Sequence, residues 1–407
     1  MPPRMVLLLA LAACAPAPEV DDRPVEHTGP VETYGFLTRL GDDTVAAERI
    51  SRSATALVSD AVDQWPIVRQ RHTEFAIAPD GRLSRMVMEI TTPSGTTEDD
   101  RFRRVLARFT PDSVHVTIHQ ASRTTARSFA TEGALTVPHV SMLYGVIEFE
   151  ITAALKRAAT VDSGQELLFR QFYPDRDVGP SFVLHRGRVV PQGPGRIELR
   201  HDWLAGTGVV TVDTAGRLLH YDGDRTTYKV QVERLADPPD VEAIAASLVA
   251  RERAAGPRAL SVRDTARGTI GSAMLEVDYG RPIARGRVLL GNVISYDRVW
   301  RTGANAATQF TTSAPLTIGG LDLPAGSYTL WTVPHRDGAE LIVNAETGQW
   351  GTGYDATRDV GRVPLRVEDL ATPVDTFTIA VVPRDGRSGA LTFAWGPFRW
   401  TAEVVVR

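Results

Sequence analysis

Two-residue alternation of apolar and polar residues marks several segments before residue 236, as expected for β-strands with one buried face. In Ser113 to His119, valine or isoleucine occupies every second position, and threonine or histidine lies between them. Two hairpins are predicted, one at Thr73 to Thr92 with its turn at Pro79-Asp80-Gly81, and one at Gly208 to Tyr221. Thr226 to Val232 alternates again. We therefore expect a curved antiparallel sheet over residues 33–236.

Two segments have the spacing of helices instead of strands. His139 to Ala158 places apolar residues three and four positions apart, which predicts one amphipathic helix packed on the sheet. Asp240 to Ala255 begins at a residue suited to capping a helix and ends before Gly256 and Pro257. Because prolines precede this second segment, we interpret residues 237–258 as a helical linker between two domains.

Residues 259–407 predict short strands separated by turn residues, a pattern typical of a β-sandwich. Trp395, Phe398 and Trp400 near the C-terminus add large apolar side chains to its core. The fold class expected is therefore mainly β: an N-terminal curved antiparallel sheet with one or two helices, then a C-terminal β-sandwich. The expected sandwich strands are Ala273 to Tyr279, Arg287 to Val293, Ala307 to Thr312, Ser327 to Val333, Glu340 to Asn344, Val363 to Val367, Thr376 to Val382 and the final strands from Leu391 to Val406.

Four motifs in this last third resemble a known family. They are VDYGRPIARGR (277–287), SYDRVWRTGANAAT (295–308), IGGLDLPAGSYTLWTVP (318–334) and NAETGQWGTGYD (344–355). In content, order and spacing they closely resemble the bacterial domain-of-unknown-function family 2911. Since that family has no characterised function, the resemblance implies a fold and a bacterial compartment but no reaction.

The N-terminus has the pattern of a bacterial lipoprotein signal peptide. A short basic start is followed by the apolar run Met5 to Ala13, which is too short to span a bilayer, and then by Leu-Ala-Ala-Cys ending at Cys14. Cys14 is the only cysteine in the chain and stands where a lipobox requires one. We expect cleavage after residue 13, lipid on Cys14, and a flexible tether over the rest of residues 14–32, which are rich in proline and acidic side chains.

Composition limits the compartment and the partners. Removal of the signal peptide leaves no second cysteine for a disulfide, so the folded part must be stable without one. Ala15 does not match an inner-membrane retention signal, which favours the outer membrane facing the periplasm. The net charge of -4 gives no reason to expect nucleic acid as a partner. The expected partners are the membrane, through Cys14, and a small anionic, sugar or lipid ligand.

The candidate ligand-binding residues all lie in the sandwich, where arginines and aromatic residues alternate with glycines. Arginine offers a planar set of donors for carboxylate or phosphate, and aromatic faces stack on sugars. The alternative is structural: Arg281 and Arg301 would pair with Asp278 or Asp297, and Trp300 would fill the core. The candidates are Tyr279, Arg281, Arg287, Tyr296, Arg301 and Asn305.

No catalytic residue, metal site or cofactor site is predicted. The sequence contains no nucleophile elbow, zinc-protease motif or phosphate-binding loop. His115 and His119 would lie about 13 Å apart on one strand, too far to share a metal. Asp355 and Asp359 lack the spacing of a calcium loop. A non-catalytic binding module of the cell envelope is favoured, with a structural or assembly lipoprotein and an uncharacterised hydrolase as alternatives.

The lipidation prediction is tested by Cys14→Ser. Because the cysteine thiol receives the lipid, the variant should remain unprocessed or be released from the membrane fraction. Metabolic labelling with a radioactive fatty acid should mark the wild-type protein alone. Equal labelling of the variant would contradict the prediction.

Overall fold

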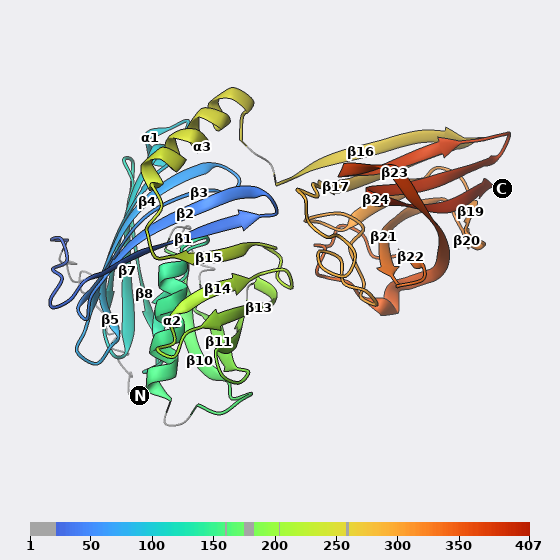
Figure 1. Ribbon diagram of the computed structural model, residues 1–407. Coiled ribbons are helices and arrows are strands. Elements are labelled where there is room, and N and C mark those ends of the chain that lie inside the picture. The colour runs from blue at the N-terminus through green and yellow to red at the C-terminus, as the bar shows by residue number, and fades with distance from the viewer. Residues whose placement is uncertain (1–21, 159–160, 175–182, 203, 258–259) are drawn as a thin grey trace, which may run out of the picture.

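The computed structural model describes residues 22–158, 161–174, 183–202, 204–257 and 260–407, so Cys14 and the signal peptide lie outside the described residues. The chain is mainly β, with one large N-terminal sheet and a separate C-terminal sheet (Figure 1). This confirms the fold class expected from the alternation pattern. None of the described helices is long and apolar enough to cross a membrane.

The N-terminal sheet has fifteen strands in the order β8-β7-β6-β5-β4-β3-β2-β1-β15-β14-β13-β12-β11-β10-β9. Neighbours are antiparallel except β9 and β10, which are parallel. The first strand, β1, pairs with both β2 and β15, and this seam joins the two halves of the sheet. The strands are β1 Glu32–Leu40, β2 Asp43–Arg52, β3 Ala56–Gln64, β4 Val68–Ile77, β5 Leu83–Thr91, β6 Phe102–Phe109, β7 Ser113–His119, β8 Thr124–Ala130, β9 Thr136–Pro138, β10 Leu167–Phe172, β11 His185–Pro191, β12 Arg196–His201, β13 Leu204–Val212, β14 Leu218–Asp222 and β15 Gln231–Leu235; the one-turn helix α1, Glu98–Arg101, precedes β6.

The predicted hairpins are present as β4–β5 and β13–β14, and β7 has the predicted alternation, with Val114, Val116 and Ile118 buried. The strand predicted at Thr226 to Val232 starts too early in the chain. Thr226 to Val230 form a loop, and β15 starts at Gln231. The side chain of Thr226 explains the loop, because its hydroxyl donates to Gly223 O at 2.7 Å and holds a turn.

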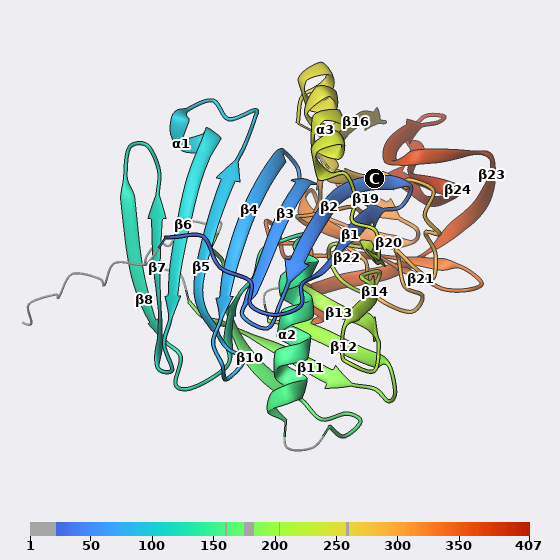
Figure 2. The same cartoon turned by 60° about the vertical axis from the view of Figure 1, so that its left-hand side comes forward.

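Helix α2, Tyr144–Arg157, packs inside the curve of the N-terminal sheet (Figures 1 and 2). All its residues from Tyr144 to Ala154 are buried, because strands from both halves of the sheet surround it. The helix begins five residues later than predicted, since the backbone N–H of His139 bonds to the oxygen of Phe172, the last residue of β10. The carboxylate of Glu48 on β2 accepts from the N–H groups of Tyr144 and Gly145, at 2.6 and 3.0 Å, and caps the helix.

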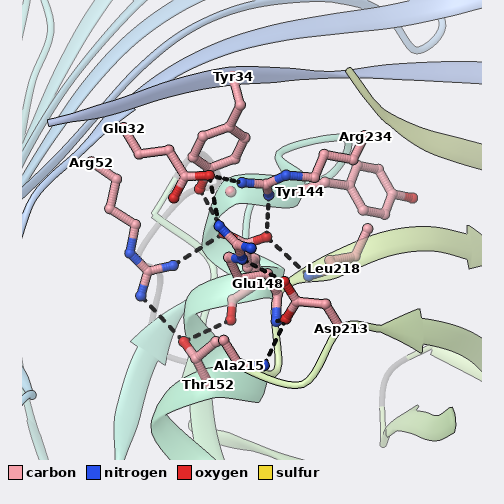
Figure 3. Close-up of polar contacts among 12 residues, drawn as sticks. Glu32, Tyr34, Arg52, Tyr144, Glu148, Thr152, Asp213, Ala215, Leu218 and Arg234 are labelled. Carbon is pink, nitrogen blue, oxygen red and sulfur yellow. Dashed lines mark hydrogen bonds and ion pairs between the residues drawn. The ribbon is translucent and has the colours of Figure 1, made fainter. Parts of the chain in front are cut away.

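Glu148 of α2 is the centre of a buried polar cluster, which we call the Glu148 network (Figure 3). Its carboxylate accepts from Tyr34 Oη on β1 at 2.6 Å, from Arg234 Nη1 on β15 at 2.5 Å and from the backbone N–H of Leu218 on β14 at 2.9 Å. Arg52 Nη1, at the end of β2, donates at 3.1 Å. One helical side chain thereby contacts four strands on both sides of the seam.

Helix α3, Val241–Ala255, has the predicted ends. Asp240 accepts from Ala243 N at 2.9 Å as the N-cap, and Gly256 is the C-cap. The helix packs on β2, β3 and β4 through an apolar cluster containing Ala47, Val62, Val241 and Leu248. This predicted linker helix is therefore attached to the N-terminal sheet.

The C-terminal sheet has nine strands in the order β16-β17-β18-β21-β22-β23-β24-β19-β20. It folds back on itself: the Tyr279 hydroxyl on β17 accepts from Ile379 N on β23 at 2.9 Å, and the layers enclose Phe377, Trp395 and Trp400. The strands are β16 Ser261–Ile270, β17 Ala273–Pro282, β18 Thr308–Thr312, β19 Leu316–Ile318, β20 Leu321–Leu323, β21 Gly326–Pro334, β22 Ala339–Asn344, β23 Asp359–Pro383 and β24 Ser388–Val406, with the short 3-10 helix η1 at Ala356–Arg358.

The strand predicted at Arg287 to Val293 is wrong, because this segment forms turns. Gly286 and Gly291 have φ values of 71° and 89°, which bend the chain out of the extended conformation. Arg287 also donates to the backbone oxygens of Ala284 and Ile283, at 2.9 and 2.6 Å, and stabilises the turn. β16 was not predicted, since most of its side chains are polar and partly or fully exposed.

The Glu148 network predicts a large cost for neutralising its carboxylate. Glu148→Gln should lower the free energy of unfolding by about 3–5 kcal/mol, because Arg52 would lose its carboxylate and the largely buried Arg234 would keep only the more exposed Glu32. Denaturant unfolding measures the loss. Glu150→Gln is the matched control: Glu150 is equally buried on the same helix but bonds to Gln171 at 2.7 Å instead of to an arginine. Equal losses of unfolding free energy in the two variants would contradict the stabilising role of the Glu148 charge.

The buried carboxyl of Glu48 predicts that the free energy of unfolding depends on pH. Burial raises the pKa of Glu48 from an ordinary 4.5 to about 7. The folded state therefore holds this proton more tightly than the unfolded state, and the stability from the group is complete below pH 4.5 and lost as pH rises to 7. Glu48→Gln removes the charge, while its amide oxygen can still accept from the N–H groups of Tyr144 and Gly145. Its unfolding free energy relative to wild type should rise by on the order of 3 kcal/mol between pH 4.5 and 8. A constant difference over this range would show that Glu48 does not titrate there.

Candidate ligand-binding site

A cavity of about 560 Å³ lies where the two sheets meet. The N-terminal side contributes Leu40 at the end of β1, Trp65 after β3, and the loop Thr227 to Lys229 before β15. The C-terminal side contributes the turns between β17 and β18, with Trp350 and Trp395. Neither sheet alone forms this cavity.

The charged residues of the cavity lining are all basic. Among the described lining residues there is no aspartate or glutamate, although the whole chain carries a net charge of -4. Aromatic rings form much of the remaining wall. The basic residues are Lys229, Arg285, Arg287, Arg298 and Arg301, and the aromatic residues are Trp65, Tyr228, Trp300, Trp350 and Trp395. The cavity therefore combines concentrated positive charge with flat apolar surfaces.

Trp300 fixes the segment that carries Arg301. Its indole stacks on Trp395, with ring centres 5.8 Å apart, and meets Phe377 edge-on at 5.2 Å. Its backbone forms two hydrogen bonds with Thr332 on β21, at 2.7 and 2.9 Å. Thr302 and Asn305 then adopt φ values of 50° and 63°, which turn the chain sharply. Arg301 and Asn305 consequently lie on a loop beside the cavity, with Trp300 as its anchor in the sandwich.

Arg301 has no carboxylate within ion-pair distance among the described residues. Within the described ranges, its guanidinium has one hydrogen bond, to Asn305 O at 3.4 Å. Burial lowers the pKa of Arg301, since no neighbouring anion compensates for the lost water. The side chain passes so close to Gly351 that a Cβ there would lie 2.2 Å from Arg301 Cδ. This residue is held in place by packing, while its charge remains without an ionic partner.

Arg285 connects the two sheets. It is only 7% exposed, and its Nε donates to Asp43 Oδ2 on β2 at 2.9 Å. The backbone N–H of Asp42 donates to Arg285 O at 3.0 Å, so the β1–β2 turn packs against this residue. Gly41 allows the approach, because a Cβ at that position would lie 2.0 Å from Arg285 O. These contacts hold the two sheets together next to Leu40 and Arg285, which line the cavity.

Comparison with known families gives one match. Residues 261–404 match the family described as "Protein of unknown function (DUF2911)". The match confirms the resemblance of the C-terminal third. No curated protein matches the chain. Among solved structures, a DUF1089 family protein from Pseudomonas aeruginosa is similar at 13% identity and a TM-score of 0.33, over 50% of this chain and 97% of that one. A similarity this weak supports no conclusion.

The DUF2911 segment supplies one wall of the cavity, and residues outside it supply the other. Of the six candidates predicted in this segment, Arg287, Arg301 and Asn305 line the cavity together. The Arg287 guanidinium also donates hydrogen bonds within its own turn. Burial beside Arg285 lowers the pKa of Arg287 to about 10. These three residues remain the candidates that the structure brings together.

The other three candidates lie elsewhere in the DUF2911 segment. Tyr279 is buried in the core, bonded to the backbone of Ile379. Arg281 donates to Asp264 at 2.9 Å and to Phe377 O at 3.2 Å, which ties β17 to β16 and β23. The ring of Tyr296 lies under the guanidinium of Arg336, at 5.1 Å. These contacts are structural, and none of the three side chains lines the cavity.

The residues that form the cavity wall outside the DUF2911 segment were not predicted from the sequence. Lys229, Trp65 and Tyr228 were not predicted, because they become neighbours of Arg301 only when the two sheets meet. One signal was available: Lys229 is one of just two lysines in the chain. Burial lowers the pKa of Lys229 to about 8, and the charges of Arg301 and Arg287 add to this effect.

The remaining polar candidates have local partners. His115 bonds to Ser113 and Ser128, and His119 bonds to Thr124. Asp355 caps η1, and Asp359 accepts from Tyr354 and Asn344. The part of the chain that the structure describes contains no group of three or more histidine, cysteine or acidic side chains arranged for a metal.

Proposed function

We propose that the protein is a binding module of the bacterial cell envelope, held at the outer membrane by lipid on Cys14. Its ligand is a small anion that carries an aromatic or sugar ring, bound in the cavity between the two sheets. The observation that carries this proposal is the lining of five basic residues and no acidic ones.

The charge of the lining supports an anionic ligand. Arg285 has Asp43 as its counterion, but among the described residues no carboxylate lies within ion-pair distance of Lys229, Arg287, Arg298 or Arg301. Positive charges brought together in this way repel one another, and an anion relieves this cost. Arg301 supports the proposal most directly, because its guanidinium offers unused donors in a planar arrangement that suits a carboxylate or phosphate. Asn305 lies beside it and adds an amide.

The aromatic wall supports a ring on the same ligand. Trp300 and Trp395 are fixed by stacking, whereas Trp350 is 58% exposed and is free to cover a flat molecule. Trp65 and Tyr228 pack together across the cavity lining, with ring centres 5.3 Å apart. A small inorganic anion would leave these surfaces unused, so a ring-bearing anion fits the lining better.

Calorimetric titration of the full chain with phenyl phosphate, inorganic phosphate and neutral benzyl alcohol tests the proposal. Phenyl phosphate should bind most tightly, since it uses both the charge and the aromatic wall. Arg301→Ala should weaken its binding by roughly 10- to 100-fold, the effect of losing a charge-assisted hydrogen bond. The unfolding midpoint should change little, because no buried carboxylate loses its partner.

Arg358→Ala is the matched control, since it removes an exposed arginine on η1, outside the cavity lining. It should leave phenyl phosphate binding unchanged. Failure of the wild-type chain to bind phenyl phosphate, or equal binding by the Arg301→Ala variant, would overturn the proposal.

A further inference from the structure

Lys229 lines the cavity and carries the primary amine nearest to its arginines, whose charges act on it. It ends the Thr227 to Lys229 loop and has a φ of 58°, in the left-handed region that lysine rarely adopts. The loop is firmly held: the buried hydroxyl of Thr226 accepts from Tyr228 N at 3.2 Å, and the Tyr228 hydroxyl bonds to Ser141 Oγ at 2.9 Å. The position of the amine is thus built into the fold.

The surroundings of the amine increase the fraction of Lys229 that is neutral, compared with an ordinary lysine. Lys229 Nζ donates to the backbone oxygen of Asp224 at 2.5 Å, and no carboxylate lies within ion-pair distance of it among the described residues. Burial opposes protonation most, and the positive charges of Arg301 and Arg287 add to it, whereas the charges of Asp224 and Asp222 partly offset this effect. With a pKa of about 8, roughly a tenth of the amine is neutral at pH 7, against fewer than one in a thousand for an ordinary lysine. A neutral amine has the lone pair that a nucleophile needs.

We propose that Lys229 captures the carbonyl carbon of a small anionic carbonyl compound, of the α-keto acid class, as a reversible imine. The choice of an anionic partner rests on the proposed function, because the arginines of the cavity would hold the carboxylate. The aromatic wall accommodates the remainder of the molecule.

The reaction is balanced without an oxidant or a reductant. The nitrogen lone pair attacks the carbonyl carbon and forms the C–N bond, while a proton moves from nitrogen to the carbonyl oxygen. The resulting carbinolamine loses its hydroxyl with a proton, as water, and the C=N bond forms. Addition of water reverses the sequence and releases the keto acid.

Borohydride trapping of the full chain tests this inference. The protein is incubated with phenylpyruvate near pH 8, reduced with sodium borohydride and digested, and the lysine peptides are measured by mass spectrometry. Lys156, exposed at the end of α2, is the internal control because the chain has no third lysine. Lys229 should be modified at least about tenfold faster than Lys156. Excess phenyl phosphate should protect Lys229 alone, and Lys229→Arg should leave only the slow reaction.

The two proposals fail separately. If phenyl phosphate binds but Lys229 reacts no faster than Lys156, the amine is not a capture site and the anion site stands. If Lys229 is trapped rapidly while phenyl phosphate neither binds nor protects, the proposed anion-binding function is wrong and the nucleophilic amine stands. Because the lysines are compared within one wild-type chain, the result does not depend on a variant that folds.

Discussion

The carboxylate of Glu148 is the contact on which the N-terminal half depends. A fifteen-stranded sheet that curves around a single helix needs a fixed relation between its two halves, whose strands pair with each other at β1 and β15. Glu148 supplies this relation, since it binds Tyr34 on one strand and Arg234 on the other (Figure 3). The opposite ends of the same strands carry Leu40 and, just before β15, Lys229 into the cavity. The position of the cavity wall therefore follows from a contact made inside the sheet.

Three buried glutamates, Glu148 and Glu150 on α2 and Glu48 beside it, differ in the groups that bond to their carboxyls. Glu48 accepts hydrogen bonds from the helix N-terminus without a cation, and burial raises its pKa to about 7. Glu150 is bonded to Gln171, and burial raises its pKa as well. Glu148 has two arginines, which compensate for the water lost on burial. Only the last of these carboxylates is suited to holding strands together through its charge.

The sequence predicted elements whose pattern is local and missed those that depend on distant contacts. The alternation at Val114, Val116 and Ile118 and the caps of α3 are properties of a few neighbouring residues, and both are present in the structure. Arg287 was assigned to a strand because the apolar residues after it outweighed the turn that its own side chain stabilises. In the candidate site, the motif around Arg301 was visible in the sequence, but the pairing of this loop with Lys229 required the two sheets to meet. No pattern among neighbouring residues in the sequence indicates that the two sheets pack together in this way.

A cavity with one wall from each sheet couples the affinity for a ligand to the relative orientation of the two sheets. A ligand that touches both walls adds to the free energy holding the sheets in their orientation, and reciprocity requires the orientation to add equally to the affinity. Asp43, which bonds to Arg285 across the junction, lies outside the cavity lining. Asp43 therefore affects the affinity only through the orientation of the two sheets, because its salt bridge limits rotation between them. A force that separates the sheets would release a bound ligand.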